Sequence, residues 1–195
     1  MLWDDFMNSV HRDWRGDGKI DDRLDDAEWI RKWLDKHSFA DFPLPDAGQV
    51  ESLKAFRELL YRLAQAFVDG VPPVGSDLRE LNGTMAAGHV VRSLEMVEGG
   101  RYVLELQPTE RNWESAKAEI AASFARTLSE GEPSRIRFCD NPNCLWVYYD
   151  DTRNRSKRYC DDKLCGNLMK VRRFRARKKA EAAAASSNRE TSDEQ

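Results

Sequence analysis

The segments Cys139-Asp-Asn-Pro-Asn-Cys144 and Cys160-Asp-Asp-Lys-Leu-Cys165 decide how the last third of this 195-residue chain folds. They contain all four cysteines of the sequence, in the spacing C-x4-C-x15-C-x4-C. Two cysteine pairs separated by a loop of this length are typical of a tetrahedral thiolate metal site. The Asn-Pro-Asn run favours a tight turn, and a helix-like run begins at about Cys165. The pattern predicts a small metal-binding module of the treble-clef type.

A structural Zn²⁺ ion is the leading interpretation of the four thiolates. The sequence opens without a signal peptide and holds no apolar run of membrane-spanning length, so we expect a cytoplasmic protein whose thiols stay reduced. Four protein ligands would leave no open coordination position, which favours a structural over a catalytic ion. Two alternatives stay open: four buried cysteines without a metal, and an iron or iron–sulfur site that uses the same thiolates.

Charge is divided sharply along the chain. Residues 1–134 hold 16 Lys/Arg and 25 Asp/Glu, a net charge of -9, whereas residues 135–179 hold 14 Lys/Arg and 5 Asp/Glu, a net charge of +9. The remaining residues carry -3, which completes the formal total of -3. A basic module attached to an acidic body indicates an anionic partner, and nucleic acid is the usual one.

The predicted nucleic-acid contacts lie in the loop between the cysteine pairs and on the helix after them. Lys and Arg side chains there would neutralise phosphates, and Asn or Arg side chains would reach base edges. Leu168, Val171 and Phe174 share one face of the predicted helix and would pack on the metal core. The contact residues are Arg153, Asn154, Arg155, Lys157, Arg158, Asn167, Lys170, Arg172, Arg173, Arg175, Arg177 and Lys178.

The N-terminal part reads as a mainly α-helical domain with one β-hairpin, so the fold class is α+β. Asp25 and Glu28 resemble a capping box, and Ser76 is a candidate cap of a later helix. Gly99-Gly100 sits between two alternating runs and predicts a hairpin turn. The expected helices cover about residues 29–34, 53–67, 78–85 and 113–128, the hairpin covers 90–106, and a short strand covers 135–138.

The cysteine segment resembles the CGNR zinc finger. The carrying residues are Asp150-Asp-Thr-Arg-Asn-Arg-Ser156 before the third cysteine and Cys165-Gly-Asn-Leu-Met-Lys170 after it. Leu2-Trp-Asp-Asp-Phe-Met-Asn-Ser-Val10 resembles the opening of the ABATE domain, the usual partner of that finger. The resemblance implies zinc ligation by the four cysteines in a bacterial transcription regulator. Leu168 departs from it, because it stands where the motif has arginine, and Asp4 replaces an apolar residue.

Three domain segments and one leading function follow. We expect an ABATE-like domain at 1–134 that binds a ligand or mediates contacts, a finger at 135–180 and a disordered polar tail at 181–195 that first extends the last helix. The function would be zinc-dependent regulation by binding double-stranded DNA in the nucleoid, with a small-molecule effector, a homodimer and no membrane contact. A ligand pocket is predicted at Trp3, Phe6, Asn8, Trp29 and Trp33.

Two other classes of function compete with that reading. Trp146, Tyr148 and Tyr149 would allow an RNA- or protein-binding adaptor, since unpaired bases stack on aromatic side chains. An enzyme is not expected, because the acid pairs of the body come without a nucleophile motif, a phosphate loop or an open metal site.

Overall fold

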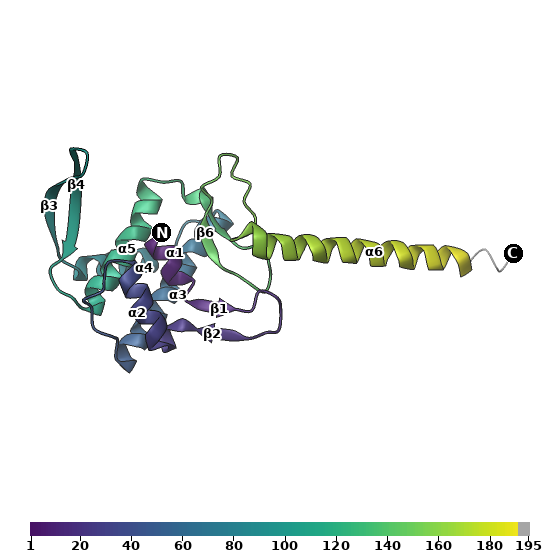
Figure 1. The fold of residues 1–195 in the computed structure, drawn as a ribbon, viewed down its shortest axis with the longest axis horizontal. Coiled ribbons are helices and arrows are strands. Elements are labelled where there is room, and N and C mark those ends of the chain that lie inside the picture. Colours follow the sequence, from purple (N-terminus) through teal and green to yellow (C-terminus); the bar gives the residue numbers. More distant parts are fainter. Residues whose placement is uncertain (191–195) are drawn as a thin grey trace.

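The computed structural model describes residues 1–190. The protein consists of a helical body from which a long C-terminal helix projects (Figure 1). The fold class is α+β, as predicted. The helices are α1 Leu2–Met7, α2 Ala27–Lys36, α3 Ala47–Asp69, α4 Gly75–Ala87, α5 Trp113–Ser129 and α6 Asn167–Glu190, with short turns η1 Arg23–Asp25, η2 Pro133–Arg135 and η3 Asp162–Gly166. The strands are β1 Val10–Arg12, β2 Ile20–Asp22, β3 Val90–Val97, β4 Arg101–Pro108, β5 Ile136–Phe138 and β6 Val147–Tyr149.

A side-chain cap starts α2, and a left-handed glycine ends α3. The N-cap of α2 is Asp26, whose carboxylate accepts from the backbone N–H groups of Glu28 and Trp29, so the predicted cap at Asp25 was wrong by one residue. The predicted cap at Ser76 was also wrong, because α4 begins at Gly75 without a side-chain cap. Helix α3 ends at Gly70, whose φ of 68° is left-handed, as the Gly-Val-Pro-Pro run indicates.

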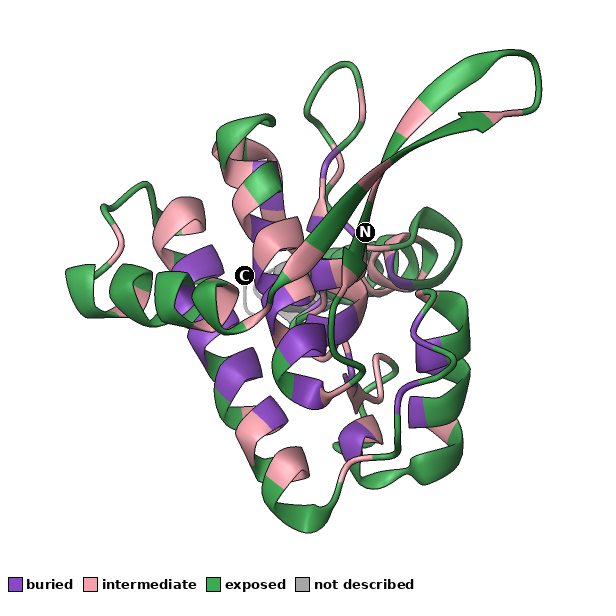
Figure 2. Ribbon diagram, turned by 90° about the vertical axis from the view of Figure 1, so that its left-hand side faces the viewer, coloured by how far each residue is buried: buried purple, intermediate pink, exposed green. Residues whose placement is uncertain are grey.

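The main core lies where α1, α2, α3 and α5 meet (Figure 2). Trp3 and Phe124 form an edge-to-face pair with ring centroids 5.3 Å apart, and the indole N–H of Trp3 donates to Thr127 Oγ1 at 2.9 Å. The pair contributes packing energy while the indole keeps its hydrogen bond. Apolar residues at three- and four-residue spacing on α3, such as Leu53, Leu60 and Leu63, are fully buried in this core.

One buried ion pair ties the first hairpin to the core. Arg57 of α3 is 3% exposed and donates through Nη1 and Nη2 to both carboxylate oxygens of Asp22, and also to Ser9 Oγ at 2.7 Å. Burial raises the pKa of Asp22, but the bonds and charge of Arg57 outweigh it and leave the pKa lowered. Arg57 can therefore be buried, because the carboxylate of Asp22 neutralises its charge.

The chain forms three antiparallel hairpins within the described residues. The predicted hairpin is confirmed as β3–β4, in which Val90 pairs with Pro108 and Val97 with Arg101. The short strand predicted at 135–138 is confirmed as β5, whereas β1, β2 and β6 were not predicted, because strands of three residues are too short for a period-two pattern to stand out. The β3–β4 hairpin projects from the body as a ribbon at the end opposite α6 (Figure 1).

The β5–β6 hairpin belongs to the main core although it leads into the cysteine segment. Ile136 and Val147 are buried in that core at 1% and 0% exposure. Asn8, just after α1, donates from Nδ2 to the Val147 carbonyl at 2.8 Å and accepts from the Val147 N–H at 2.9 Å. Packing is thus continuous across residue 134, and the domain boundary there stays a prediction.

Helix α6 runs through Glu190, so the first ten residues of the expected tail extend the last helix, as predicted. The disorder expected in the tail falls on residues 191–195, which lie outside the described residues. Among residues 1–190, no helix combines the length and the apolar content that crossing a membrane requires.

Candidate metal centre and basic surface

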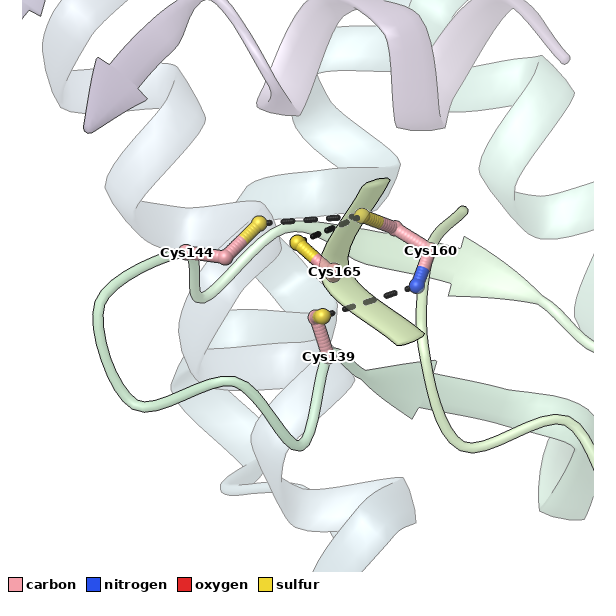
Figure 3. Close-up of side chains that lie close together, drawn as sticks. All are labelled: Cys139, Cys144, Cys160 and Cys165. Atoms are coloured by element: carbon pink, nitrogen blue, oxygen red, sulfur yellow. Dashed lines mark hydrogen bonds between the residues drawn. The ribbon is translucent and has the colours of Figure 1, made fainter. Parts of the chain in front are cut away.

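The four cysteine side chains converge on one point (Figure 3). Their Sγ atoms all lie within 4.8 Å of one another, with 3.6 Å between Cys144 and Cys160 and 3.9 Å between Cys160 and Cys165. Thiolates at the corners of a tetrahedron with metal–sulfur bonds of about 2.3 Å lie about 3.8 Å apart. The cluster therefore has the dimensions of a four-thiolate metal site, as the spacing predicted.

Two backbone turns hold the ligands in place. Around the first pair, the Cys139 N–H donates to the Trp146 carbonyl at 2.8 Å and the Cys144 N–H to the Asn141 carbonyl at 2.9 Å. Leu145, which follows that pair, has a left-handed φ of 56°, an uncommon conformation for a residue with a side chain. The second pair flanks η3, where the Asp161 carboxylate accepts from the Leu164 N–H at 2.7 Å.

The thiols affect one another's protonation because they are crowded and mostly buried. Hydrogen bonds from the Cys144 and Cys160 thiols hold the pKa of Cys139 far below its ordinary value. The same proximity to Cys139 raises the pKa of Cys144 and of Cys160. A bound divalent cation would remove this conflict, since it favours the thiolate form of every ligand. The donor set therefore fits a soft or borderline metal ion.

A second layer of contacts around the cysteines comes from the N-terminal part of the chain. The buried Asn141 donates from Nδ2 both to Cys165 Sγ at 3.3 Å and to the Trp14 carbonyl at 2.9 Å. Arg172 Nη2 donates to the Arg15 carbonyl at 2.5 Å. At Gly16 the φ is 101°, and a Cβ there would meet the Asn143 side chain at 2.8 Å. The β1–β2 loop is thus fitted against the metal centre, which sequence spacing did not indicate.

A small second core surrounds the metal ligands. It contains Tyr148 and Tyr159, which are buried at 6% and 8% exposure, together with half-buried Trp14, Trp146 and Met169. The predicted packing of Val171 and Phe174 on this core was wrong, because their side chains are 44% and 52% exposed. Helix α6 leaves the body after its first turn, so Met169 takes that place and Leu168 is half-buried.

The loop between the cysteine pairs is shaped by one buried carboxylate. Asp150 is 0% exposed and accepts from the Thr152 N–H at 3.0 Å, the Thr152 hydroxyl at 2.5 Å and the Lys157 N–H at 3.0 Å. Burial raises its pKa, but the bonds from Thr152 and Lys157 outweigh it, and the pKa is lowered. The Asp-x-Thr part of the motif therefore acts as the scaffold of the basic loop.

The predicted nucleic-acid residues are brought to one end of the molecule, on the loop and on α6. Arg153, Lys170 and Arg175 are exposed, and within the described residues they carry no ion pair or side-chain hydrogen bond. Others are engaged: Arg155 with Glu132, Arg158 with Asp140, Arg177 and Lys178 with Glu181, Asn167 with the Lys163 carbonyl, Arg173 with the Met169 carbonyl and Lys157 over the Tyr148 ring. Exposed ion pairs of this kind are worth about 0–1 kcal/mol, so these cations remain able to exchange partners.

The residues of the predicted ligand pocket occupy other roles. Trp3, Phe6 and Trp33 are buried in the main core, and the Trp29 ring stacks on Trp33 with centroids 6.4 Å apart. Asn8 holds strand β6 through its two hydrogen bonds. A ligand pocket at these five positions stays a prediction.

Comparison with protein families agrees with this geometry. The family model ABATE, described as "Putative stress-induced transcription regulator", matches residues 2–131. The CGNR zinc finger model matches residues 135–178, which contain the four cysteines and the start of α6. A search of curated proteins found no match. The chain belongs to the ABATE family and carries a CGNR zinc finger at its C-terminal side.

Proposed function

We propose that this protein is a zinc-dependent transcription regulator that binds double-stranded DNA through its finger and α6. The functional division would follow the predicted segments, with residues 1–134 regulatory, 135–180 binding DNA and 181–195 forming a tail. The carrying observation is that a four-thiolate cluster anchors a helix with seven Lys/Arg between Lys170 and Lys179, which projects from an acidic body (Figure 1). Such a regulator would work in the cytoplasm, at the nucleoid.

Zinc suits this site for two reasons. Four thiolates at tetrahedral spacing are the usual ligand set of structural Zn²⁺. The ion would fix the start of α6, because Cys165 lies two residues before that helix, and the first helical turn then sets its direction. Metal release would therefore leave the basic helix without a defined orientation on DNA.

The distribution of charge supports a polyanionic partner such as DNA, bound at one end of the molecule. Exposed cations are concentrated on the loop at Arg153 and along α6, whereas the body carries a net charge of -9 that would be repelled by phosphates. Only one end of the molecule can therefore approach the duplex. Binding through these cations should weaken with salt, with a log–log slope of about -0.9 for each phosphate neutralised.

The experiment is fluorescence anisotropy with random-sequence and selected duplex DNA, using zinc-loaded protein. We expect chelation to abolish binding. A Lys170→Gln/Arg173→Gln/Arg175→Gln variant should lose affinity by about 100-fold, and the steepness of its salt dependence should fall by an amount that corresponds to up to three fewer neutralised phosphates. The matched control removes three exposed body cations, Arg31→Gln/Arg79→Gln/Arg101→Gln, and should retain affinity. Equal losses in both variants, or retained sequence-selective binding after chelation, would contradict the proposal.

Single-stranded RNA is the alternative nucleic acid. It would need exposed aromatic faces, but Tyr148 is buried in the second core and Tyr149 packs on the main core, where its hydroxyl accepts from the Glu132 N–H at 3.1 Å. The half-buried Trp146 lies edge-on to His11 with ring centroids 6.3 Å apart. Packing therefore favours duplex DNA. Competing unlabelled RNA against duplex DNA should displace the protein only weakly.

A groove of about 870 Å³ between α3, β1 and the first cysteine turn is the site we propose for a small effector. Its walls include Tyr61 and Phe138, whose rings stack with centroids 6.1 Å apart, and half-buried Arg12 and Arg137. Neither arginine has an ion-pair partner within residues 1–190, so both could pair with an anionic ligand, while Glu58, Asp69 and Asp140 give the groove acidic groups as well. Small carboxylates and inorganic phosphate, tested by thermal shift, should stabilise the wild type but not Arg12→Gln, whereas Arg31→Gln should respond as the wild type does.

A further inference from the structure

The β3–β4 ribbon turns its apolar side chains away from the body. In the register of the hairpin, Leu94 pairs with Leu104 and Met96 with Tyr102, so the four side chains lie on one face. They are 68%, 61%, 68% and 65% exposed. On the opposite face Ser93 and Glu105 are half-buried, and Val91 near the base is an exposed apolar residue. This reverses the usual sheet pattern, in which the apolar face is covered and the polar face meets water.

An apolar face of this size on a two-stranded ribbon indicates a contact with another molecule. Isolated two-stranded hairpins are marginally stable and are normally supported by a third strand or by packing. Within the described residues β3 and β4 pair only with each other, and the ribbon stands out from the body (Figures 1 and 2). The largest apolar patch on a typical monomer covers about 300–600 Å² and is often functional, so a patch of this size is a candidate contact surface.

We propose that this ribbon face is the contact between two copies of the chain. The face is apolar apart from Arg92 at its base, so the surface that covers it must be apolar too, and the same face of a second copy meets that condition. With Leu106 the patch offers on the order of 500 Å² per copy, and two copies would bury about 1,000 Å², the lower end of a specific interface.

Charge argues against nucleic acid or an anionic membrane as the molecule that covers this face. The body that carries the ribbon has a net charge of -9, which repels phosphates and anionic headgroups. If two ribbons pack face to face and antiparallel, the base of each covers the tip of the other. Arg92 at the base then approaches Glu98 at the tip of the second copy, so the charges at the ends of the patch are complementary.

The dimer would set the geometry of DNA binding. The ribbon and α6 lie at opposite ends of the molecule, so joined ribbons place the two basic helices at the outer ends of the assembly (Figure 1). Such a dimer would engage two separated DNA segments rather than adjacent half-sites. This consequence rests on the proposed DNA binding, whereas the contact itself does not.

The test is the mass of the full, zinc-loaded chain in solution without DNA, measured by light scattering and sedimentation. We expect about twice 22.5 kDa for the wild type at micromolar concentration. Leu104→Asp should raise the dimer dissociation constant by about 100-fold or more, because the dimer would bury two carboxylates without partners. Leu94→Asp should do the same.

The matched control is Val91→Asp, which makes the same change at a position 58% exposed on the other face of the ribbon. It should remain dimeric, and all variants should keep the helical circular dichroism and metal content of the wild type. A monomeric wild type would overturn the proposal, as would a dimer unaffected by Leu104→Asp and Leu94→Asp or equally weakened by Val91→Asp. None of these results depends on DNA binding, so failure of that proposal would be recognised separately.

Discussion

The helical body and the cysteine module keep their shapes by different means. The body buries large apolar side chains from four helices, including Trp3, Phe6, Leu60 and Phe124, at 0–1% exposure. In the module's own core the buried residues are two tyrosines and three of the metal-ligand cysteines. So small a core cannot by itself offset the entropy of ordering the loop and the start of α6, whereas a bound metal ion can.

This difference predicts that the body keeps its core when the module loses its metal ion. It also predicts that the module can change its structure without unfolding the body. The two regions meet at the β5–β6 hairpin, which packs on the body and carries the first cysteine pair at its turn.

The largest expected effect comes from removing a metal ligand. Cys165→Ser should lose the bound metal, lower DNA affinity by more than about 100-fold and expose the amides of the module to hydrogen exchange. The amides of α3 and α5 should stay protected. Exchange measured by mass spectrometry, with chelator added to the variant as a control that should change nothing further, checks this. If the module stays protected from exchange without metal, its fold does not depend on the metal ion.

A cavity in the main core should destabilise the body and leave metal binding by the module unchanged. Phe124→Ala removes a fully buried ring and should lower the free energy of unfolding by about 3–5 kcal/mol, with metal affinity in the folded state unchanged. Phe174→Ala, at a ring 52% exposed, is the matched control and should cost little. Denaturant unfolding measures the free energy of unfolding, and a metal-competition titration measures the metal affinity. A large loss of metal affinity in Phe124→Ala would show that the regions are not separable.

The junction should affect both regions at once. Asn8→Ala leaves the N–H and carbonyl of Val147 without their side-chain partner and should cost about 1–3 kcal/mol of stability. Because β6 continues from the first cysteine pair, metal affinity should fall as well. The exposed Asn82→Ala is the control. If unfolding free energy drops and metal affinity does not, the hairpin belongs to the body alone.

The smallest expected effect is a loss of stability of the body at low pH. Burial raises the pKa of Asp5, but the bonds from His37 and Lys36 outweigh it and lower the pKa to about 2. A carboxyl whose folded pKa is depressed stabilises the fold above its unfolded pKa, so this contribution is complete above about pH 4 and is lost toward pH 2. Allowing for partial exposure, it amounts to about 1 kcal/mol.

Asp5→Asn should therefore flatten the fall in unfolding free energy between about pH 4 and pH 2. Thermal melts over that range, with the exposed Asp35→Asn as control, measure it. An unchanged acid slope in Asp5→Asn would show that the contact with His37 and Lys36 does not stabilise the body.

Sequence reasoning succeeded where spacing alone carries the structure. The apolar periods of residues 53–67 and 113–128 identified α3 and α5, and the Gly99-Gly100 turn identified the β3–β4 hairpin. The four cysteines identified a metal site whose sulfur atoms do converge. These features are local or repeated, so a single sequence displays them.

The sequence did not predict the roles of residues whose partners are distant in the chain. Asn8 and Asn141 carry no local signal, yet one holds strand β6 and the other donates to a metal-ligand sulfur. Val171 and Phe174 have helical spacing but face water, because α6 leaves the body and its face has nothing to pack against. Periodicity predicts which side chains share a face, but it does not predict what that face packs against.

Residue type and spacing along the chain are enough to predict the helical body, the cysteine cluster and the division of charge. The folded molecule adds that the β1–β2 loop touches the metal centre, that the β5–β6 hairpin belongs to the main core and that the ribbon exposes its apolar face. Each of these features depends on which segments, far apart in the chain, do or do not pack together. Their energies depend on how the helices pack, which no local pattern records.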